Sequence, residues 1–302
     1  MEEFIEKAVG RVIECMRENL GEHITIDDMA RTAMFSKFHF SRVFLRVTGV
    51  SPGRFLSAMR LQEAKRLLVA TSLSVTDISH RVGYSSVGTF SSRFRASVGV
   101  SPTMYRRLGG FTSRICVDGR RPVGSSRQTD IRGHVRPPLA GRAGLVFIGL
   151  FPDRLPQGNP VRCAVLSGPG PYTLEMVPQG TWHVLAYSPA MTEDECDVDA
   201  RRVTAGEVTT GGVGANGVSA GGAGAFGVSG SGVSASSVSA SGGVPPAPEY
   251  DGFVGVHGPL VVRAEMGARP VDLRLRPTNQ LDPPVLLAVL DREPVTAQAQ
   301  LG

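Results

Sequence analysis

Two segments of the chain carry side chains whose types and spacing could read DNA, and the first is SKFHFSRVFLRV (36–47). Its apolar positions fall on one side of a helix, at Phe40, Val43, Phe44 and Val47. The opposite side carries a mixed set: Lys37, Phe38, Ser41, Arg42, Leu45 and Arg46. In a major groove, arginine can bridge guanine O6 and N7, and apolar groups can meet thymine methyls. The alternative is a solvated charged face with partly buried apolar groups.

The second segment, SVGTFSSRFRASV (86–98), repeats the arrangement with weaker chemistry. Its apolar side comprises Phe90, Phe94 and Val98. The outer side is small and mildly polar, and it offers Val87, Gly88, Ser91, Ser92 and Arg95, while Arg93 is a further candidate for a DNA contact. Serine hydroxyls can hydrogen-bond to a base or a phosphate but give no bidentate contact. We expect this segment to discriminate less between bases.

The tetrapeptide GVSP follows each segment, at residues 49–52 and 99–102, and indicates how the segments are positioned. Glycine is favoured just past the end of a helix, whereas Ser-Pro combines a good N-cap with proline at the first helical position. The repeated unit runs from Met29 to Phe55 and from Ile78 to Tyr105, with one extra residue in the second turn. It predicts two helix-turn-helix units.

The elements around these units are also predicted from local patterns. Thr25-x-x-Asp28 and Ser74-x-x-Asp77 resemble capping boxes that open a short helix in each unit. PGRFLSAMRLQEAKRLLVA (52–70) predicts one helix about 28 Å long between the units. A helix of that length can hold two recognition helices about one DNA turn, roughly 34 Å, apart.

Charge agrees with a polyanionic partner for this half of the chain. Residues 1–110 hold 16 Lys+Arg and 10 Asp+Glu, a balance of +6, although the whole chain carries +5. Four cysteines without zinc-ligand spacing fit a reducing compartment. No apolar run approaches the roughly 20 residues of a membrane span. We therefore expect a cytoplasmic protein with no membrane partner, associated with the nucleoid when it is bound to DNA.

From about residue 128 the pattern changes to short β-type runs. They are GLVFIGLF, VRCAVL, PYTLEMV, TWHVLAYS, PLVVRAE, VDLRL and VLLAVL, separated by turns rich in proline and glycine. We predict an all-α domain (1–110), a linker (111–127) and an antiparallel β-sandwich or barrel (128–302). Residues 208–244 contain no charged residue and are almost all Gly, Ser, Ala, Val and Thr. They indicate a disordered, flexible insertion at about 200–245.

Nothing in the second half predicts catalysis, a cofactor or a metal site. His134, His183 and His257 are isolated, and the alternation around His183 favours a solvent-facing side chain over a metal ligand. DECDVD (194–199) has four carboxylates but lacks the glycine and terminal glutamate of an EF-hand loop. Cys163 is expected to be a small core residue. We expect the protein not to be an enzyme.

The helical half resembles the DNA-binding domain of the AraC/XylS transcriptional regulators over residues about 5–108. The matching residues are Ser36, Phe40, Ser41-Arg42, Phe44 and TGVSP, then RLQEAKRLL (60–68), VTDISHRVGYSS (75–86), TFSSRF and GVSPTMYR (99–106). The resemblance implies base contacts from Phe38, Ser41 and Arg42, and from Val87, Gly88, Ser91 and Ser92. The family often has arginine where Ser92 stands, whereas this chain has its arginine at Arg93.

The segment PGPYTLEMVPQGTWHVLAY is similar to the carboxypeptidase-regulatory-like, transthyretin-like β-sandwiches, with Trp182 in an aromatic position of their pattern. Together the two resemblances imply a regulator that binds double-stranded DNA and contacts RNA polymerase, with a small-molecule or protein effector at its C-terminal domain. The alternative is a β-sandwich protein whose main role is to bind a ligand or partner and whose DNA binding is secondary.

Overall fold

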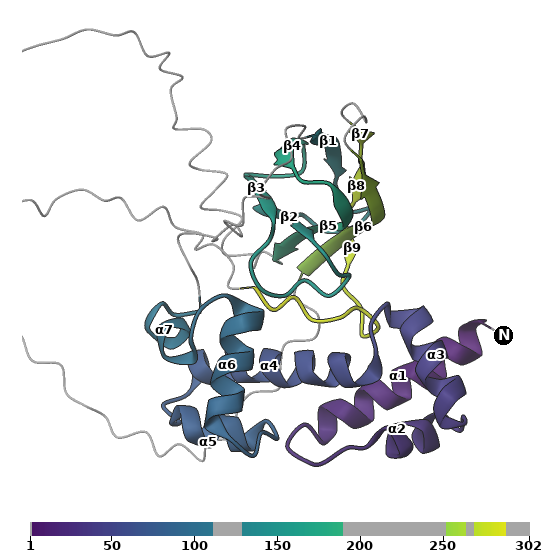
Figure 1. Ribbon diagram of the computed structural model, residues 1–302, viewed down its shortest axis with the longest axis vertical. Helices are drawn as coiled ribbons and strands as arrows, with labels where there is room; N and C mark the ends of the chain where they lie inside the picture. The colour runs from purple at the N-terminus through teal and green to yellow at the C-terminus, as the bar shows by residue number, and fades with distance from the viewer. Residues whose placement is uncertain (1, 111–128, 190–251, 264–268, 288–302) are drawn as a thin grey trace, which may run out of the picture. The chain divides into compact units, whose positions relative to one another are not determined.

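The computed structural model describes residues 2–110, 129–189, 252–263 and 269–287 (Figure 1). We call residues 2–110 the helical region and the remaining described residues the strand region. The predicted linker, the DECDVD segment and the predicted insertion at about 200–245 lie outside the described residues.

The helical region is built from the helices that the sequence patterns predict. They are α1 (Glu2–Glu18), α2 (Ile26–Ala33), α3 (Lys37–Thr48), α4 (Pro52–Ala70), α5 (Val75–Arg81), α6 (Val87–Val98) and α7 (Pro102–Arg107). Figure 1 shows α4 running between one group, α1–α3, and a second group, α5–α7. Helices α2–α3 form the first helix-turn-helix unit and α5–α6 the second.

Local capping explains where these helices begin and end. Thr25 and Asp28 form the predicted capping box at α2, and the Ser74 hydroxyl accepts the Asp77 N–H at α5. Gly49 and Gly99 close α3 and α6 with φ of 78° and 95°, a left-handed conformation that glycine adopts at little cost. Ser51 precedes Pro52 as predicted, but its side chain makes no capping bond.

Each unit has an aromatic core of the same design. Phe40, Phe44 and Phe55 stack edge to face at centroid separations of 5.5 and 5.4 Å. Phe90, Phe94 and Tyr105 are spaced in the same way at 5.7 and 5.6 Å, with the first pair of rings tilted and the second pair edge to face. The predicted core positions of the two recognition helices are buried, except that Val47 is only half-buried. Its neighbour Thr48 is buried instead.

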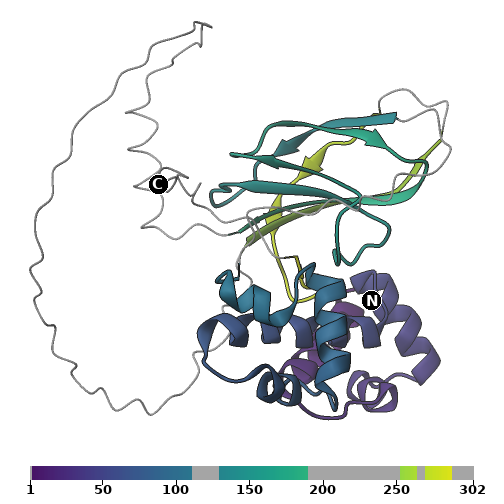
Figure 2. The same ribbon diagram turned by 60° about the vertical axis from the view of Figure 1, so that its left-hand side comes forward.

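The strand region consists of two sheets whose strands lie close together in both views (Figures 1 and 2). Its strands are β1 (Thr129–Arg136), β2 (Val146–Phe151), β3 (Arg162–Leu166), β4 (Pro171–Val177), β5 (Gly180–Pro189), β6 (Gly252–Val262), β7 (Arg269–Pro270), β8 (Leu273–Arg274) and β9 (Arg276–Pro277). One sheet has the order β4-β1-β7, with β8 also paired to β1, and the other has the order β3-β2-β5-β6-β9.

Most strand pairs are antiparallel, in agreement with the sequence patterns. β5 pairs with β2 from Phe147 opposite Tyr187 to Phe151 opposite His183. The short β7 and β8 differ from that expectation, because both pair with β1 in parallel. They follow β6, which belongs to the other sheet, so they approach β1 from a crossover instead of a hairpin.

The apolar residues of the two sheets meet in one buried cluster. It includes Ile131 and Leu174 from the first sheet, and Ile148 and Val184 from the second. β2 is buried along its whole length because its alternate residues, Phe147 and Phe151, join a smaller cluster on the other face of the second sheet. Leu287 belongs to that smaller cluster.

Three predictions for the strand region differ from the structure. The run at 285–290 was expected to form a strand, but residues 285–287 pack by side chain without joining a ladder, and the rest lies outside the described residues. β1 and the first half of β6 were not among the predicted runs. His183 is half-buried instead of solvent-facing; it lies opposite Phe151 at the end of β2 and next to Gly258 of β6.

Candidate nucleic-acid interface

The outer face of α3 carries exposed apolar and cationic side chains together. Phe38 is 83% exposed and Leu45 50%, although both are large apolar side chains. Arg42 and Arg46 are exposed, and among the described residues neither guanidinium has a hydrogen-bond or ion-pair partner. The face therefore offers free donors beside apolar groups, which is the combination that base edges and thymine methyls can use.

Lys37 and Ser41 stand on the same helix but have protein partners. The Lys37 ammonium lies 3.0 Å from Asp27 in the first turn of α2, and the Ser41 hydroxyl donates to the Lys37 carbonyl at 2.9 Å. Lys37 thus helps to hold α2 against α3, and its charge is partly offset at this point. Arg42 and Arg46 are the stronger candidates for contacts outside the chain.

The outer face of α6 is exposed but chemically milder. Val87 is 38% exposed, and Gly88, Ser92 and Arg95 are also exposed, whereas Ser91 is half-buried. Like Arg42, Arg95 has no hydrogen-bond or ion-pair partner within the described ranges. The second unit therefore presents small groups with one free guanidinium near the end of its helix.

Arg93 points elsewhere. Its Nη1 donates to the Ser57 hydroxyl of α4 at 3.4 Å, so its side chain extends across α4 and not along the face formed by Val87 and Ser92. One residue along a helix is a rotation of about 100°, which explains why an arginine one position after Ser92 does not replace an arginine at Ser92.

Three cationic residues missed by the sequence reasoning hold the helices in place. The Arg60 guanidinium donates to the carbonyls of Leu20, Glu22 and Gly83, and so ties α4 to the loops before α2 and after α5. Arg106 donates to the Leu68 and Leu73 carbonyls. In the sequence, the only feature that could have indicated this structural role is a charged residue beside apolar neighbours.

Lys65 is the third of these residues and is buried. Its Nζ donates to the carbonyls of Val285 and Leu287 at 3.2 and 3.0 Å and lies 5.9 Å from the Tyr105 ring centre. Burial away from water lowers the pKa of the Lys65 ammonium to about 7.

For the described residues, the sequence also led to expectations about metal sites and cysteines. Nowhere in these ranges do three His, Cys, Asp or Glu side chains gather to hold a metal ion. Cys163 is a half-buried free thiol against the smaller cluster, and burial raises its pKa, which makes it less reactive. No helix in the described part of the chain is both long and apolar enough to cross a membrane.

Comparisons with known proteins agree with the geometry of the helical region. A helix-turn-helix domain family matches residues 29–108. The HTH-type transcriptional activator AarP of Providencia stuartii is 31% identical over 104 residues, which are 34% of this chain and 77% of that protein. The lactose operon transcription activator of Staphylococcus xylosus is 29% identical over 104 residues, with 34% of this chain and 37% of that protein covered.

A solved structure is also similar in sequence. It is a transcriptional regulator from Chromobacterium violaceum, described as AraC-type, which is 28% identical, covers 34% of this chain and 93% of that one, and has a TM-score of 0.34. The resemblance of the strand region to carboxypeptidase-regulatory-like sandwiches has no counterpart among these matches. With its two helix-turn-helix units and its similarity to proteins such as AarP, the chain belongs to the AraC family of DNA-binding transcription regulators.

Proposed function

We propose that the protein binds one unpalindromic DNA site as a monomer, with α3 and α6 in two neighbouring stretches of major groove. The observation that carries the proposal is the exposed face of α3, where Phe38 and the unpartnered Arg42 and Arg46 stand together. Phe38 is 83% exposed and Leu45 50%, so the two form an apolar patch beside free guanidinium groups, and such patches mark interaction sites more often than single exposed residues do.

The spacing of the units supports the same proposal. α4 has 19 residues, which corresponds to about 28 Å of helix. Recognition helices at its two ends can reach successive major grooves, which are roughly 34 Å apart on one side of the duplex. Exposed arginines of the helical region would then anchor the phosphates on either side of the two recognition helices.

We expect the two units to differ in how strictly they specify the DNA bases that they contact. Arg42 can give a bidentate contact to guanine, whereas Ser91 and Ser92 offer only single hydroxyl contacts. Val87 and Gly88 add van der Waals contact alone. We therefore propose a site with one strictly specified element and, about 10 base pairs away, a loosely specified one.

The strand region is proposed to be a β-sandwich that senses an effector or contacts another protein, such as RNA polymerase. Its support is the single buried cluster shared by the two sheets. The chain would act without enzymatic chemistry, in the cytoplasm. In the second candidate function, the strand region is the main binding module and DNA binding is secondary. The same buried cluster supports that function.

The deciding experiment is selection of a DNA site with the full chain, followed by affinity measurements for every single-base variant of that site. The proposal expects penalties of about 1–3 kcal/mol at the positions under α3 and smaller ones under α6. Equal penalties in both elements, or a palindrome of identical halves, would refute monomeric, asymmetric reading. Binding of equal strength to all sequences would favour the second candidate.

A further inference from the structure

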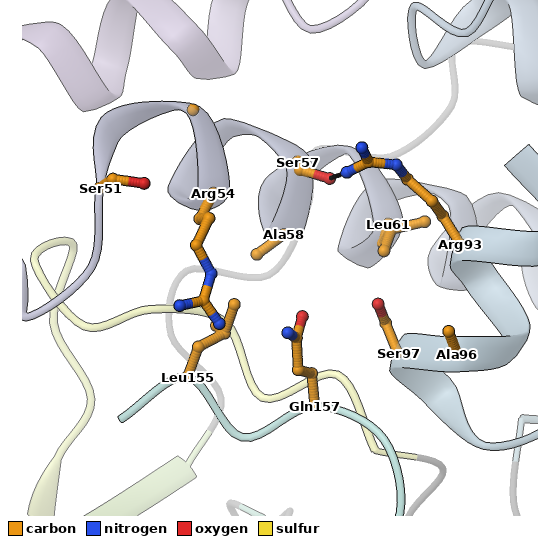
Figure 3. A pocket seen from close by; sticks show the side chains of 11 residues that line it. Ser51, Arg54, Ser57, Ala58, Leu61, Arg93, Ala96, Ser97, Leu155 and Gln157 are labelled. Atoms are coloured by element: carbon orange, nitrogen blue, oxygen red, sulfur yellow. Dashed lines mark hydrogen bonds between the residues drawn. The ribbon is translucent and has the colours of Figure 1, made fainter. Parts of the chain in front are cut away.

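A cavity of about 480 Å³ opens beside the second unit, away from the outer faces of α3 and α6. Its walls come from the first half of α4, the last turns of α6 and the loop that joins β2 to β3 (Figure 3). Its size lies within the range of roughly 300–1,000 Å³ that is typical of small-molecule sites.

Two hydrogen-bonding contacts hold the loop in this position. The Gly158 N–H donates to the Ser97 carbonyl at 2.7 Å, and Asp153 pairs with Arg54 at 3.0 Å. The loop also inserts Leu155, which is only 2% exposed. The cavity thus has a wall fixed by main-chain and ionic contacts.

The charge of the lining is one-sided. Arg54 and Arg93 both face the cavity, and no carboxylate is among its lining residues. Arg54 is partly neutralised by Asp153, but Arg93 has only the neutral Ser57 hydroxyl as a partner in the described chain, at a long 3.4 Å. Figure 3 shows the Arg93 side chain running along the edge of the cavity, with its guanidinium beside Ser57 of α4.

The rest of the lining is mixed. Ala58 and Leu61 of α4 form an apolar floor, with Leu155 from the loop, whereas Gln157 supplies an amide. An occupant with one negative charge and a small apolar body would match both parts. Carboxylate is favoured over phosphate, because a dianion would require more than one uncompensated cation.

We propose that this cavity binds a small monocarboxylic acid, with its carboxylate held by Arg93 and Arg54 and its apolar part against Leu61 and Leu155. The inference goes beyond the proposed reading of DNA, and its test contains no DNA. It places a ligand site on α4 and α6 and not in the core of the strand region.

The test uses the full chain labelled with ¹⁵N, titrated with hexanoate and benzoate and, separately, with the uncharged hexanamide and benzamide. We expect both acids to shift the amide signals of Gly53, Ser97 and Gln157 saturably at millimolar concentrations, and the two amides to leave them unchanged. Arg93→Gln should weaken binding of the acids at least tenfold, since a hydrogen bond to a charged group is lost. Arg54→Gln should weaken it less, because Asp153 already shares that charge.

The matched control is Arg11→Gln, which removes an exposed arginine of α1 outside the cavity and should leave acid binding unchanged. Ala96→Leu, at an exposed lining position, should block binding by filling the cavity, and unchanged thermal unfolding would show that each variant is folded. The inference is overturned if neither acid gives saturable shifts, or if Arg11→Gln weakens binding as much as Arg93→Gln. It is also overturned if Arg93→Gln leaves the affinity for both acids unchanged, since Arg93 would then not hold the carboxylate.

Discussion

The two helix-turn-helix units share an interior and differ in their outer faces. Phe40, Phe44 and Phe55 in the first unit correspond to Phe90, Phe94 and Tyr105 in the second, and the corresponding centroid separations differ by 0.2 Å. On the outside, Phe38 and Arg42 stand where the second unit has small residues such as Gly88 and Ser92. The repeated core positions a recognition helix, and the free outer face decides what that helix recognises.

The largest expected effect tests whether the two interiors are equivalent. Phe44→Ala and Phe94→Ala should each lower the free energy of unfolding by about 3–5 kcal/mol, since each removes a fully buried ring and leaves a cavity. Urea unfolding of the full chain measures both. Phe38→Ala, at an exposed position, is the control and should change stability by less than about 0.5 kcal/mol. A small loss for only one of the buried rings would contradict the equivalence.

The second prediction tests whether the outer faces differ as proposed. Arg42→Ala should cost about 1–3 kcal/mol at the selected site and relax the base preference under α3. Ser92→Ala should weaken the free energy of DNA binding by less than about 1 kcal/mol, because it removes only one hydroxyl contact. Affinities for the selected site and a scrambled duplex measure both variants. If Arg42→Ala weakens both duplexes equally, Arg42 contacts only phosphate and the contrast between the units is lost.

The third prediction concerns Lys65, which lies under Tyr105 of the second unit and has no buried equivalent in the first. Its pKa of about 7 is below the roughly 10.4 of an unfolded lysine. Between these values the unfolded chain binds more protons, so this group makes stability rise with pH, by at most about 1.4 kcal/mol per pH unit.

Lys65→Met should remove this rise between pH 7 and about 9.5. Burial raises the pKa of the facing Tyr105, and the nearby Tyr187 charge adds to that effect, so Tyr105 does not titrate in this range. Unfolding midpoints across that range measure the effect. Lys7→Met, at an exposed ion pair on α1, is the control and should keep the wild-type slope. An identical slope in Lys65→Met would show that Lys65 stays charged in the folded state.

The smallest expected effect concerns the backbone strain in the turns of the two units. Met34 has a φ of 58° in the first turn, whereas Gly83 has a φ of 81° in the second. Met34→Gly should stabilise the chain by up to about 1 kcal/mol, because a side chain in the left-handed region is strained. Gly83→Ala should destabilise it, since the added Cβ would lie 2.6 Å from the Leu20 carbonyl oxygen. Thermal unfolding compares the two variants, and a loss of stability in Met34→Gly would mean that the first turn is not strained.

Much of the helical region follows from local sequence. The capping residues, the Ser-Pro starts and the helical spacing of phenylalanines act within a few residues of one another, so Thr25, Gly49 and Phe90 indicate their roles without the fold. The extra residue in the second turn also lies as predicted, between the left-handed Gly83 and the N-cap Ser86, where the first unit has a shorter path from Met34 to Ser36.

The strand region was less predictable because pairing joins residues far apart in the chain. β1 has only three buried apolar or neutral positions in TDIRGHVR and gives little signal until β4, β7 and β8 pair with it. The apolar run at 285–290 resembles a strand, yet residues 285–287 are used to pack on the second sheet and to accept bonds from Lys65.

For the candidate interface, the sequence by itself determined most of the residues that stand on the outer faces of α3 and α6, since helical spacing sets that side; the exception is Arg93, which lies about 100° around the helix from Ser92. Only the tertiary structure decided which of them are free. It engages Lys37 with Asp27, turns Arg93 toward Ser57 and leaves Arg42 and Arg46 without partners in the described chain. The physical reason is that the periodicity of one helix sets the side on which each of its side chains lies. The groups that bind those side chains belong to other helices, and the sequence of a single helix does not specify where these are.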